Sequence, residues 1–461
     1  MSEKKIKIII GISWLATAAI FLSYYTLSGY DNVLLYFHNY EAVFYLFFLL
    51  LAIFTLYVWV FRLIKNSLID INKKIVIVAS LALCLLLAWQ PLLNSTDFHQ
   101  YLLQARILVH HGENPYLVPP NNFVSDWEFC QSICTGMWQQ VTNMYGPWWF
   151  YFTLIPAVLA NGFFLANYLL LKLMLVAVFL ASAWLIYKIL DQRKAQLKKL
   201  GLYLFALSPL LIFEVAADGH NDIVLVFLII LHFYFLYKNR KIAALLVLTG
   251  ACLIKFITLP MLGIYFIYLY KIGGKNKNVK MAGLGLLVIM IFMLSFWPIW
   301  QGSATLNGLL FQSELKNIYQ YSPGMIFSLL ISKLIGHSDY SWLAKTITTF
   351  LYGFTFLALV IHLLRSDKLK EKYLDISLWS ILLFILLMPV INRPWYLIWV
   401  LPFLLIKGRF NWFLVFSGLA IAAKILSTTY ILLILLFLLI AYYGYRSKNL
   451  SEFKENIFRL N

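Results

Sequence analysis

The chain has 461 residues and a formal net charge of +18, with 62% hydrophobic and only 12% charged residues. Its mean hydropathy is +0.81. Soluble domains contain about 45–50% apolar and about 25% charged residues, so the composition excludes a soluble fold and predicts an all-α polytopic membrane protein. Most Lys and Arg residues lie in short polar links between apolar segments. The basic charge therefore indicates topology and contact with anionic membrane lipid, and no nucleic-acid partner is expected.

The apolar segments provide material for about 12–14 transmembrane helices, since each span needs about 20 apolar residues. The expected spans begin at Ile8, Ala42, Ile75, Phe163, Gly201, Ile223, Ile242, Ile257, Met281, Ser341, Tyr373, Trp395, Trp412 and Tyr430. Basic clusters recur after alternate spans and mark the cytoplasmic side. This pattern predicts a cell-membrane protein with both termini in the cytoplasm, and residues 1–461 leave no room for a separate soluble domain.

The polar links on the other side include one large extracytoplasmic loop, residues 94–145. Two further apolar segments, Pro147–Leu159 and Pro323–Leu334, are too short to cross a membrane and begin at a proline. We expect both to be interfacial or re-entrant helices in the outer loops.

The large loop begins with a candidate catalytic residue, Asp97. Ser95 or Thr96 can cap a helix that starts here and continues to about Val109, with Gly112 at its end. Polar and apolar residues occupy different faces, which predicts an amphipathic helix on the membrane surface. Asp97 would then lie at the water boundary, where the alternative to catalysis is a second helix cap.

A second polar group lies between two strongly apolar spans, in a short outer turn. It contains Glu214, Asp218, His220 and Asp222. Polar residues are costly at the membrane edge, so they are functional candidates. Asp218, His220 and Asp222 could hold a divalent metal, the acids could cap the flanking helices, or the group could bind a hydroxyl-rich substrate. We favour the substrate and expect no metal, because nothing in the spacing requires an ion.

Two cations stand apart in outer turns, Lys255 among apolar residues and Arg393 before Pro394 and Trp395. Either could bind a phosphate, and a guanidinium can do so with two donors. The alternatives are a snorkelling lysine and an interfacial anchor among aromatic residues. The sequence contains no nucleotide-binding glycine motif, zincin motif or serine nucleophile elbow, so no cofactor is expected.

These segments together resemble the GT-C superfamily of membrane glycosyltransferases. They look most like the bacterial polyprenyl-phosphate-mannose-dependent mannosyltransferases of glycosyltransferase family eighty-seven. The resemblance covers about residues 97–402 and is carried, in the order of the family, by several short motifs. These are Asp97 through Arg106, including His99 and Gln100, then Gly112–Tyr116, Tyr145-Gly146-Pro147, Gly219–Asp222, the Lys255 turn and Pro394-Trp395-Tyr396.

The resemblance implies a GT-C-like helical bundle and transfer of a hexose from a polyprenyl phosphate to an extracytoplasmic glycolipid or glycan, with inversion. By analogy with the family, the expected hexose is mannose. Asp97 matches the aspartate that takes the proton of the acceptor hydroxyl. Lys255 and Arg393 would stabilise the phosphate leaving group. The remaining matching residues would bind substrate, namely His99, Gln100, Arg106, Tyr145, Glu214, Asp218, His220, Asp222 and Trp395.

The sequence departs from the family in one respect, because the catalytic loop follows the third span, whereas many GT-C enzymes place it after the first. The alternative function is a lipid-linked oligosaccharide polymerase, ligase or flippase, which would share the spans and the polar outer surface. A transporter is less favoured, because transporters place polar residues near the middle of several spans.

Overall fold

The computed structural model describes residues 10–20, 22, 40–67, 71–90, 92, 95, 97–126, 137–311, 326, 330–331, 333–336, 340–387 and 393–426. All regular secondary structure in these residues is helical, which confirms the predicted all-α membrane fold. The N-terminal helix spans Ile10–Ile20. The labelled helices that follow are α2 (Tyr40–Ser67), α3 (Lys73–Ala88), α4 (Asp97–His111), α6 (Pro147–Ala160), α7 (Phe164–Arg193), α8 (Lys198–Ala206), α9 (Pro209–Ile212), η5 (Phe213–Ala217), α10 (Asp222–Tyr237), α11 (Lys241–Ile254), α12 (Leu259–Lys271), α13 (Lys277–Phe296), α14 (Asn307–Phe311), α16 (Tyr340–Leu364), α17 (Leu369–Leu387), η9 (Pro394–Trp399), α18 (Leu401–Ile406) and α19 (Phe410–Leu426).

Each expected span from Ile8 to Trp412 coincides with a helix or a broken helix, and the span expected from Tyr430 lies outside the described residues. Four helical segments in the described part are long and apolar enough to cross a membrane, and a fifth candidate is a pair bent by 43°. The four are Phe48–Asn66, Phe164–Arg193, Lys277–Ile299 and Thr346–Leu364, and the bent pair is Ala195–Ala206 with Pro209–Ala217. Most of the other apolar helices have 10–17 residues. Short and broken helices are therefore a regular feature of this bundle.

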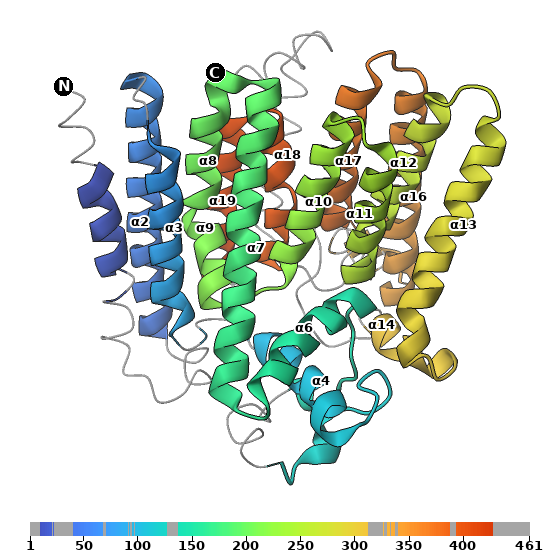
Figure 1. Ribbon diagram of the computed structural model, residues 1–461, viewed down its shortest axis with the longest axis horizontal. Coiled ribbons are helices and arrows are strands. Elements are labelled where there is room, and N and C mark those ends of the chain that lie inside the picture. Colours follow the sequence, from blue (N-terminus) through green and yellow to red (C-terminus); the bar gives the residue numbers. More distant parts are fainter. Residues whose placement is uncertain are drawn as a thin grey trace.

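The long helices run side by side, and the shorter α4 and α6 lie across one end of the bundle (Figure 1). Helix α7 packs against α3, α8 and α10, and α10 packs in turn against α11. Helices α13 and α16 instead present apolar side chains outward, including Met293, Leu294, Phe350 and Phe354. An apolar exterior of this kind fits contact with lipid hydrocarbon.

The segment predicted as an interfacial helix forms α6, whose first helical residue is Pro147. Proline suits this position because it lacks the N–H that would have no intrahelical partner there. Helix α4 begins at Asp97 and ends before Gly112 at φ +68°, as the capping signals predict. Its Gln100, Leu103 and Gln104 are buried together with its apolar residues. The helix is therefore enclosed by neighbouring elements, and the prediction of an amphipathic surface helix is wrong.

The bend between α9 and α10 contains a π-helical turn, η5, in which the Asp218 N–H donates to the Phe213 carbonyl at 3.1 Å. Such turns insert one extra residue and often occur at functional sites. Gly219 follows at φ +69°, and a Cβ there would lie 2.2 Å from the Phe98 ring. Glycine thus allows this turn to pack against the start of α4.

A second glycine docks the large loop on the bundle. The Gly146 N–H donates to the Ile254 carbonyl at 3.1 Å, and a Cβ on Gly146 would lie 2.1 Å from the Leu253 carbonyl oxygen. This contact brings Tyr145 to the end of α11, where Lys255 follows. The loop and the bundle therefore meet where the candidate site residues gather.

Replacing Gly219 by alanine tests the close approach of η5 and α4. We expect Gly219→Ala to lower stability by about 1–3 kcal/mol, because it combines a strained positive φ with a clash against Phe98. Thermal unfolding of the purified protein in detergent measures the change. Gly285→Ala is the control, because nothing lies within 4 Å of a Cβ at that position. Equal unfolding temperatures for the two variants would contradict the packing of Phe98 on Gly219.

Candidate active site

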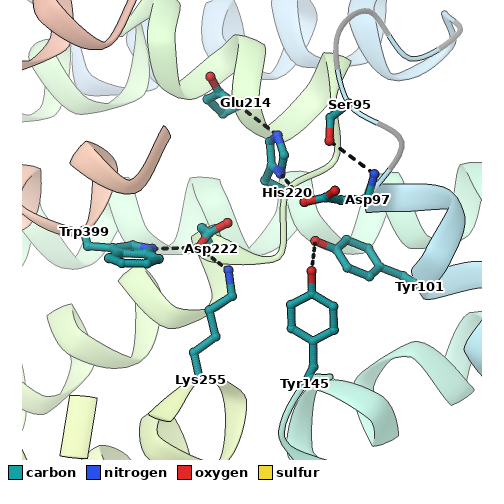
Figure 2. A network of polar contacts seen from close by, with 9 residues as sticks. All are labelled: Ser95, Asp97, Tyr101, Tyr145, Glu214, His220, Asp222, Lys255 and Trp399. Atoms are coloured by element: carbon teal, nitrogen blue, oxygen red, sulfur yellow. Dashed lines mark hydrogen bonds and ion pairs between the residues drawn. The ribbon is translucent and has the colours of Figure 1, made fainter. Parts of the chain in front are cut away.

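Polar residues predicted from separate segments of the chain meet in one cluster beside the start of α4 (Figure 2). Asp97 comes from the start of α4, and Lys255 from the turn after α11. His220 lies in the turn before α10, and Asp222 is the first residue of α10. Glu214 lies on the π turn η5, and its side chain points toward His220. Tertiary packing also brings Trp399 of η9 to Asp222, which is 177 positions earlier in the chain.

Glu214, His220 and Asp97 form a line of contacts. His220 Nε2 lies 3.2 Å from Glu214 Oε2, and His220 Nδ1 lies 4.0 Å from Asp97 Oδ2. Glu214 and His220 are buried, whereas 20% of the Asp97 side chain is exposed. The imidazole is therefore held from inside the protein, and the carboxylate at the accessible end is that of Asp97.

The surroundings raise the pKa of Asp97 above its ordinary value. Removal from water is the largest cause, because it disfavours the charged form. The positive charges of Arg393 and Lys255 oppose the rise, while the negative charges of Asp222 and Asp218 add to it. A carboxylate with a raised pKa is a stronger base than a solvated one, provided that the pH is high enough to keep it ionised.

Asp222 and Lys255 form an ion pair, with 2.6 Å between Lys255 Nζ and Asp222 Oδ1. The same oxygen accepts a hydrogen bond from Trp399 Nε1 at 2.7 Å. Rings surround the ammonium group, since its nitrogen lies 5.6 Å from the Tyr145 centroid, 5.8 Å from Tyr396 and 5.5 Å from Trp399. Lys255 is thus fixed by a partner and an aromatic wall, which snorkelling alone does not explain.

Trp395 of η9 forms a second aromatic contact in the cluster. The ring of His220 stacks on Trp395 with 4.2 Å between centroids and 26° between planes. The Arg393 guanidinium carbon lies 5.5 Å from the Trp395 ring centroid. Among the described residues, none accepts a hydrogen bond from the Arg393 guanidinium, whereas the Arg393 backbone carbonyl accepts one from the Tyr396 N–H at 3.0 Å. The guanidinium donors are therefore available to an anion.

Three residues of the cluster could also hold a metal ion. Ligand atoms of Glu214, Asp218 and His220, all buried, lie within 4.8 Å of one another. This set differs from the predicted alternative, because Glu214 replaces Asp222, which pairs with Lys255. Asp218 interacts electrostatically with Lys172, and Glu214 contacts His220. A divalent ion would thus enter a cluster whose negative charges already have positive or imidazole neighbours.

The predicted residues of α4 lie in different surroundings. His99 is partly buried, and burial together with the Lys172 charge lowers its pKa to about 4, so the imidazole is neutral at pH 7. Gln100 is fully buried, and neither atom of its amide has a hydrogen-bond partner among the described residues. Arg106 lies nine residues beyond Asp97, about 13 Å along the helix. There it forms a two-pronged ion pair with Asp126, at 2.5 and 2.7 Å, and anchors the loop.

Sequence reasoning missed four residues of this region. Tyr101 lies one turn after Asp97, and its hydroxyl accepts a hydrogen bond from the Tyr145 hydroxyl at 3.5 Å. Trp399 binds Asp222, and Asn221 is fully buried with no partner for its amide among the described residues. Lys172 is buried in α7. Lys172 had a signal of its own in the sequence, a lone charge within an apolar span, and Tyr101 and Asn221 lie inside motifs that carry the family resemblance.

A bundle of apolar helices with a cluster of ionisable residues at one end is typical of a polytopic membrane protein with a functional site. A family model described as alpha-(1->6)-mannopyranosyltransferase, N-terminal domain, matches residues 8–271, and the chain belongs to this family. The protein is accordingly a membrane glycosyltransferase of the mannosyltransferase type, as the sequence resemblance predicts. A search of curated proteins finds no match. The matched residues contain Asp97, the 214–222 cluster and Lys255, whereas Arg393 and Trp395 lie beyond them.

The raised pKa of Asp97 predicts the pH dependence of the reaction. The expected role of Asp97 as a base requires an ionised carboxylate. With that role, kcat/KM should fall as the pH drops through the pKa of Asp97, at a higher pH than an ordinary aspartate with a pKa of about 3.9 would give. Arg393→Gln removes the largest opposing charge and should move this acid limb to still higher pH. Initial rates measured across the pH range check both expectations. An acid limb that stays in place in Arg393→Gln would contradict the electrostatic coupling.

Chelation tests the alternative use of Glu214, Asp218 and His220. We expect transfer activity to survive EDTA, because the negative charges of the cluster already have protein neighbours. Rates before and after chelation, together with metal analysis of the purified protein, measure this. Loss of activity in EDTA that a divalent ion restores would show that the three residues hold a metal.

Proposed function

We propose that this mannosyltransferase moves a mannosyl group from a polyprenyl-phosphate donor to the hydroxyl of an extracytoplasmic glycolipid or glycan, with inversion. The observation that carries the proposal is the partly exposed Asp97 carboxylate beside two cations, Lys255 and Arg393, at one end of the bundle. A direct displacement from a sugar phosphate requires a base for the attacking hydroxyl and an anion-binding group for the leaving phosphate.

In this mechanism Asp97 takes the proton of the acceptor hydroxyl. The hydroxyl oxygen forms a bond to the anomeric carbon while the bond from that carbon to the phosphate oxygen breaks. Polyprenyl phosphate leaves with the electron pair of the broken bond, and the configuration inverts because attack and departure occur on opposite faces. The raised pKa of Asp97 favours proton transfer.

His220 would orient and support the base. Glu214 holds Nε2 of the imidazole at 3.2 Å, which leaves Nδ1 directed at Asp97. The gap of 4.0 Å exceeds a direct hydrogen bond and leaves room for adjustment when substrate arrives. Stacking on Trp395 fixes the plane of the ring. Glu214 and Trp395 therefore act on the base through His220.

Arg393 is the main candidate for binding the phosphate. Asp222 already compensates the charge of Lys255 at 2.6 Å, whereas the guanidinium of Arg393 has no hydrogen bond to a described residue and lies near the Trp395 ring. A guanidinium offers five N–H donors and binds phosphate with two at once. Lys255 would add positive potential nearby and hold Asp222 in place.

The sugar hydroxyls require neutral or anionic hydrogen-bonding groups. Gln100 and Asn221 provide buried amides without partners among the described residues, and such groups are costly unless a ligand or water satisfies them. We assign them, together with Asp218 and Tyr145, to the recognition of donor and acceptor hydroxyls. Attachment through a 1→6 linkage follows the description of the family.

The membrane side of the reaction follows from charge. The basic links lie at the opposite end of the bundle from α4, so the positive-inside rule assigns both termini to the cytoplasm and residues 94–145 to the outside of the cell membrane. We infer that the whole chain is one integral membrane domain. An outward site has no access to cytoplasmic nucleotide sugars, which favours a lipid-linked donor.

Replacing Asp97 by asparagine tests the base. We expect Asp97→Asn to lower transfer of labelled mannose from polyprenyl-phosphate mannose by at least about a hundredfold, because general-base catalysis contributes about 10²–10⁴-fold. Asp191→Asn is the matched control, since Asp191 pairs with Lys198 at the other end of α7. Membranes expressing each protein provide the assay. Transfer by Asp97→Asn at the wild-type rate would refute the assignment.

Arg393→Ala tests phosphate recognition. The loss of charge-assisted hydrogen bonds, about 1.5–3 kcal/mol, should raise the donor KM by about 10- to 100-fold. The acceptor KM should change little. Arg240→Ala, an exposed arginine before α11, should leave both constants unchanged. A normal donor KM in Arg393→Ala would place the phosphate elsewhere.

A further inference from the structure

We propose that Lys172 is a positioning residue that holds the turn carrying Asp218 and His220 against the start of α4; this inference rests on the proposed function. Lys172 lies on α7, is fully buried and is bound by backbone carbonyls of the protein. Its ammonium group would act on the reaction only through the residues that it positions, namely Asp218 and His220.

The ammonium group links two elements that flank the site. Lys172 Nζ donates to the Ala217 carbonyl and to the Gln90 carbonyl, each at 3.0 Å. Ala217 is the last residue of η5 and directly precedes Asp218. Gln90 follows the end of α3 and comes shortly before the start of α4. The Lys172 side chain thus connects α7 to the residues just before Asp218 and to the segment that leads into α4.

A third contact reaches the neighbour of Asp97. The Lys172 nitrogen lies 4.7 Å from the Tyr168 ring centroid and 6.0 Å from that of Phe98. Phe98 and Tyr168 also meet edge to face at 5.2 Å, and the Tyr168 hydroxyl donates to the Gln90 carbonyl at 2.8 Å. Phe98 is in turn the ring that fills the space above Gly219. Lys172 therefore contacts the aromatic rings that pack α4 against the turn after η5.

Stability alone does not account for a lysine at this position. Its neighbours Leu171, Leu175 and Val176 on α7 are buried apolar residues, and another apolar side chain would fill the same space without the cost of burying a charge. Two carbonyls, two rings and the negative charge of Asp218 compensate that cost. A buried charge with such specific partners fits a role in fixing the geometry of the site.

The test compares Lys172→Met, which keeps the length and removes the ammonium, with Lys172→Arg, which keeps the charge and the donors. Lys188→Met on the same helix is the control, since that ammonium lies over the Trp184 ring. We expect Lys172→Met to lower kcat by about 10- to 100-fold with the donor KM within about twofold, because misplaced catalytic groups reduce turnover. Lys172→Arg should restore most of the turnover.

Amide hydrogen exchange provides a readout that does not depend on activity. Residues 213–222 should exchange faster in Lys172→Met than in the wild type or in Lys188→Met, because the Ala217 carbonyl loses its anchor. Unchanged exchange in this segment would overturn the proposal even if the reaction proved to be a different one.

The kinetic outcomes separate the two proposals. Wild-type kcat in Lys172→Met, or a loss that follows the unfolding temperature and is not rescued by Lys172→Arg, would overturn the positioning role. Full activity of Asp97→Asn would instead refute the proposed function. Faster exchange at 213–222 would then still support Lys172 as the anchor of this turn.

Discussion

Charged side chains at the end of an apolar bundle are stable only when other groups compensate them, and this constraint organises the whole site. Lys255 pairs with Asp222 at 2.6 Å, and Glu214 contacts His220 at 3.2 Å. Lys172 is held by two backbone carbonyls. The inner members of the cluster are thereby fixed, and Asp97 remains at the accessible side with a raised pKa. Compensation inside the protein therefore leaves the Asp97 carboxylate at its edge.

Breaks in the helices provide the geometry that this arrangement needs. The π turn η5 and the positive φ of Gly219 end one helix abruptly and direct Glu214 and His220 toward α4. Gly146 allows the outer loop to approach the end of α11. Continuous spanning helices would leave these side chains spread along separate axes. Irregular backbone is tolerated within a membrane protein where it is enclosed by protein, as it is here.

The sequence predicted much of the fold because apolar runs and basic links repeat along the chain. Helices occur at the expected starts from Ile8 to Trp412, and the family match confirms the mannosyltransferase resemblance. The prediction was wrong for α4, which is buried on more than one side. Periodicity reports which side chains differ in polarity, but not which neighbours cover a helix. The role of Arg106 could not be predicted for a similar reason. Its partner Asp126 lies in a loop, and the local sequence does not determine where that loop runs.

By itself the sequence determined the membrane class, the positions of the helices and the set of candidate residues, because composition, hydrophobic run length and charge asymmetry are local properties. Only the tertiary structure decided which candidates meet. It joined Asp97 to His220, paired Asp222 with Lys255 and brought Trp399 to the same carboxylate. It also gave Lys172 its partners. These contacts link residues far apart in the chain, and helix packing, not local sequence, sets their distances.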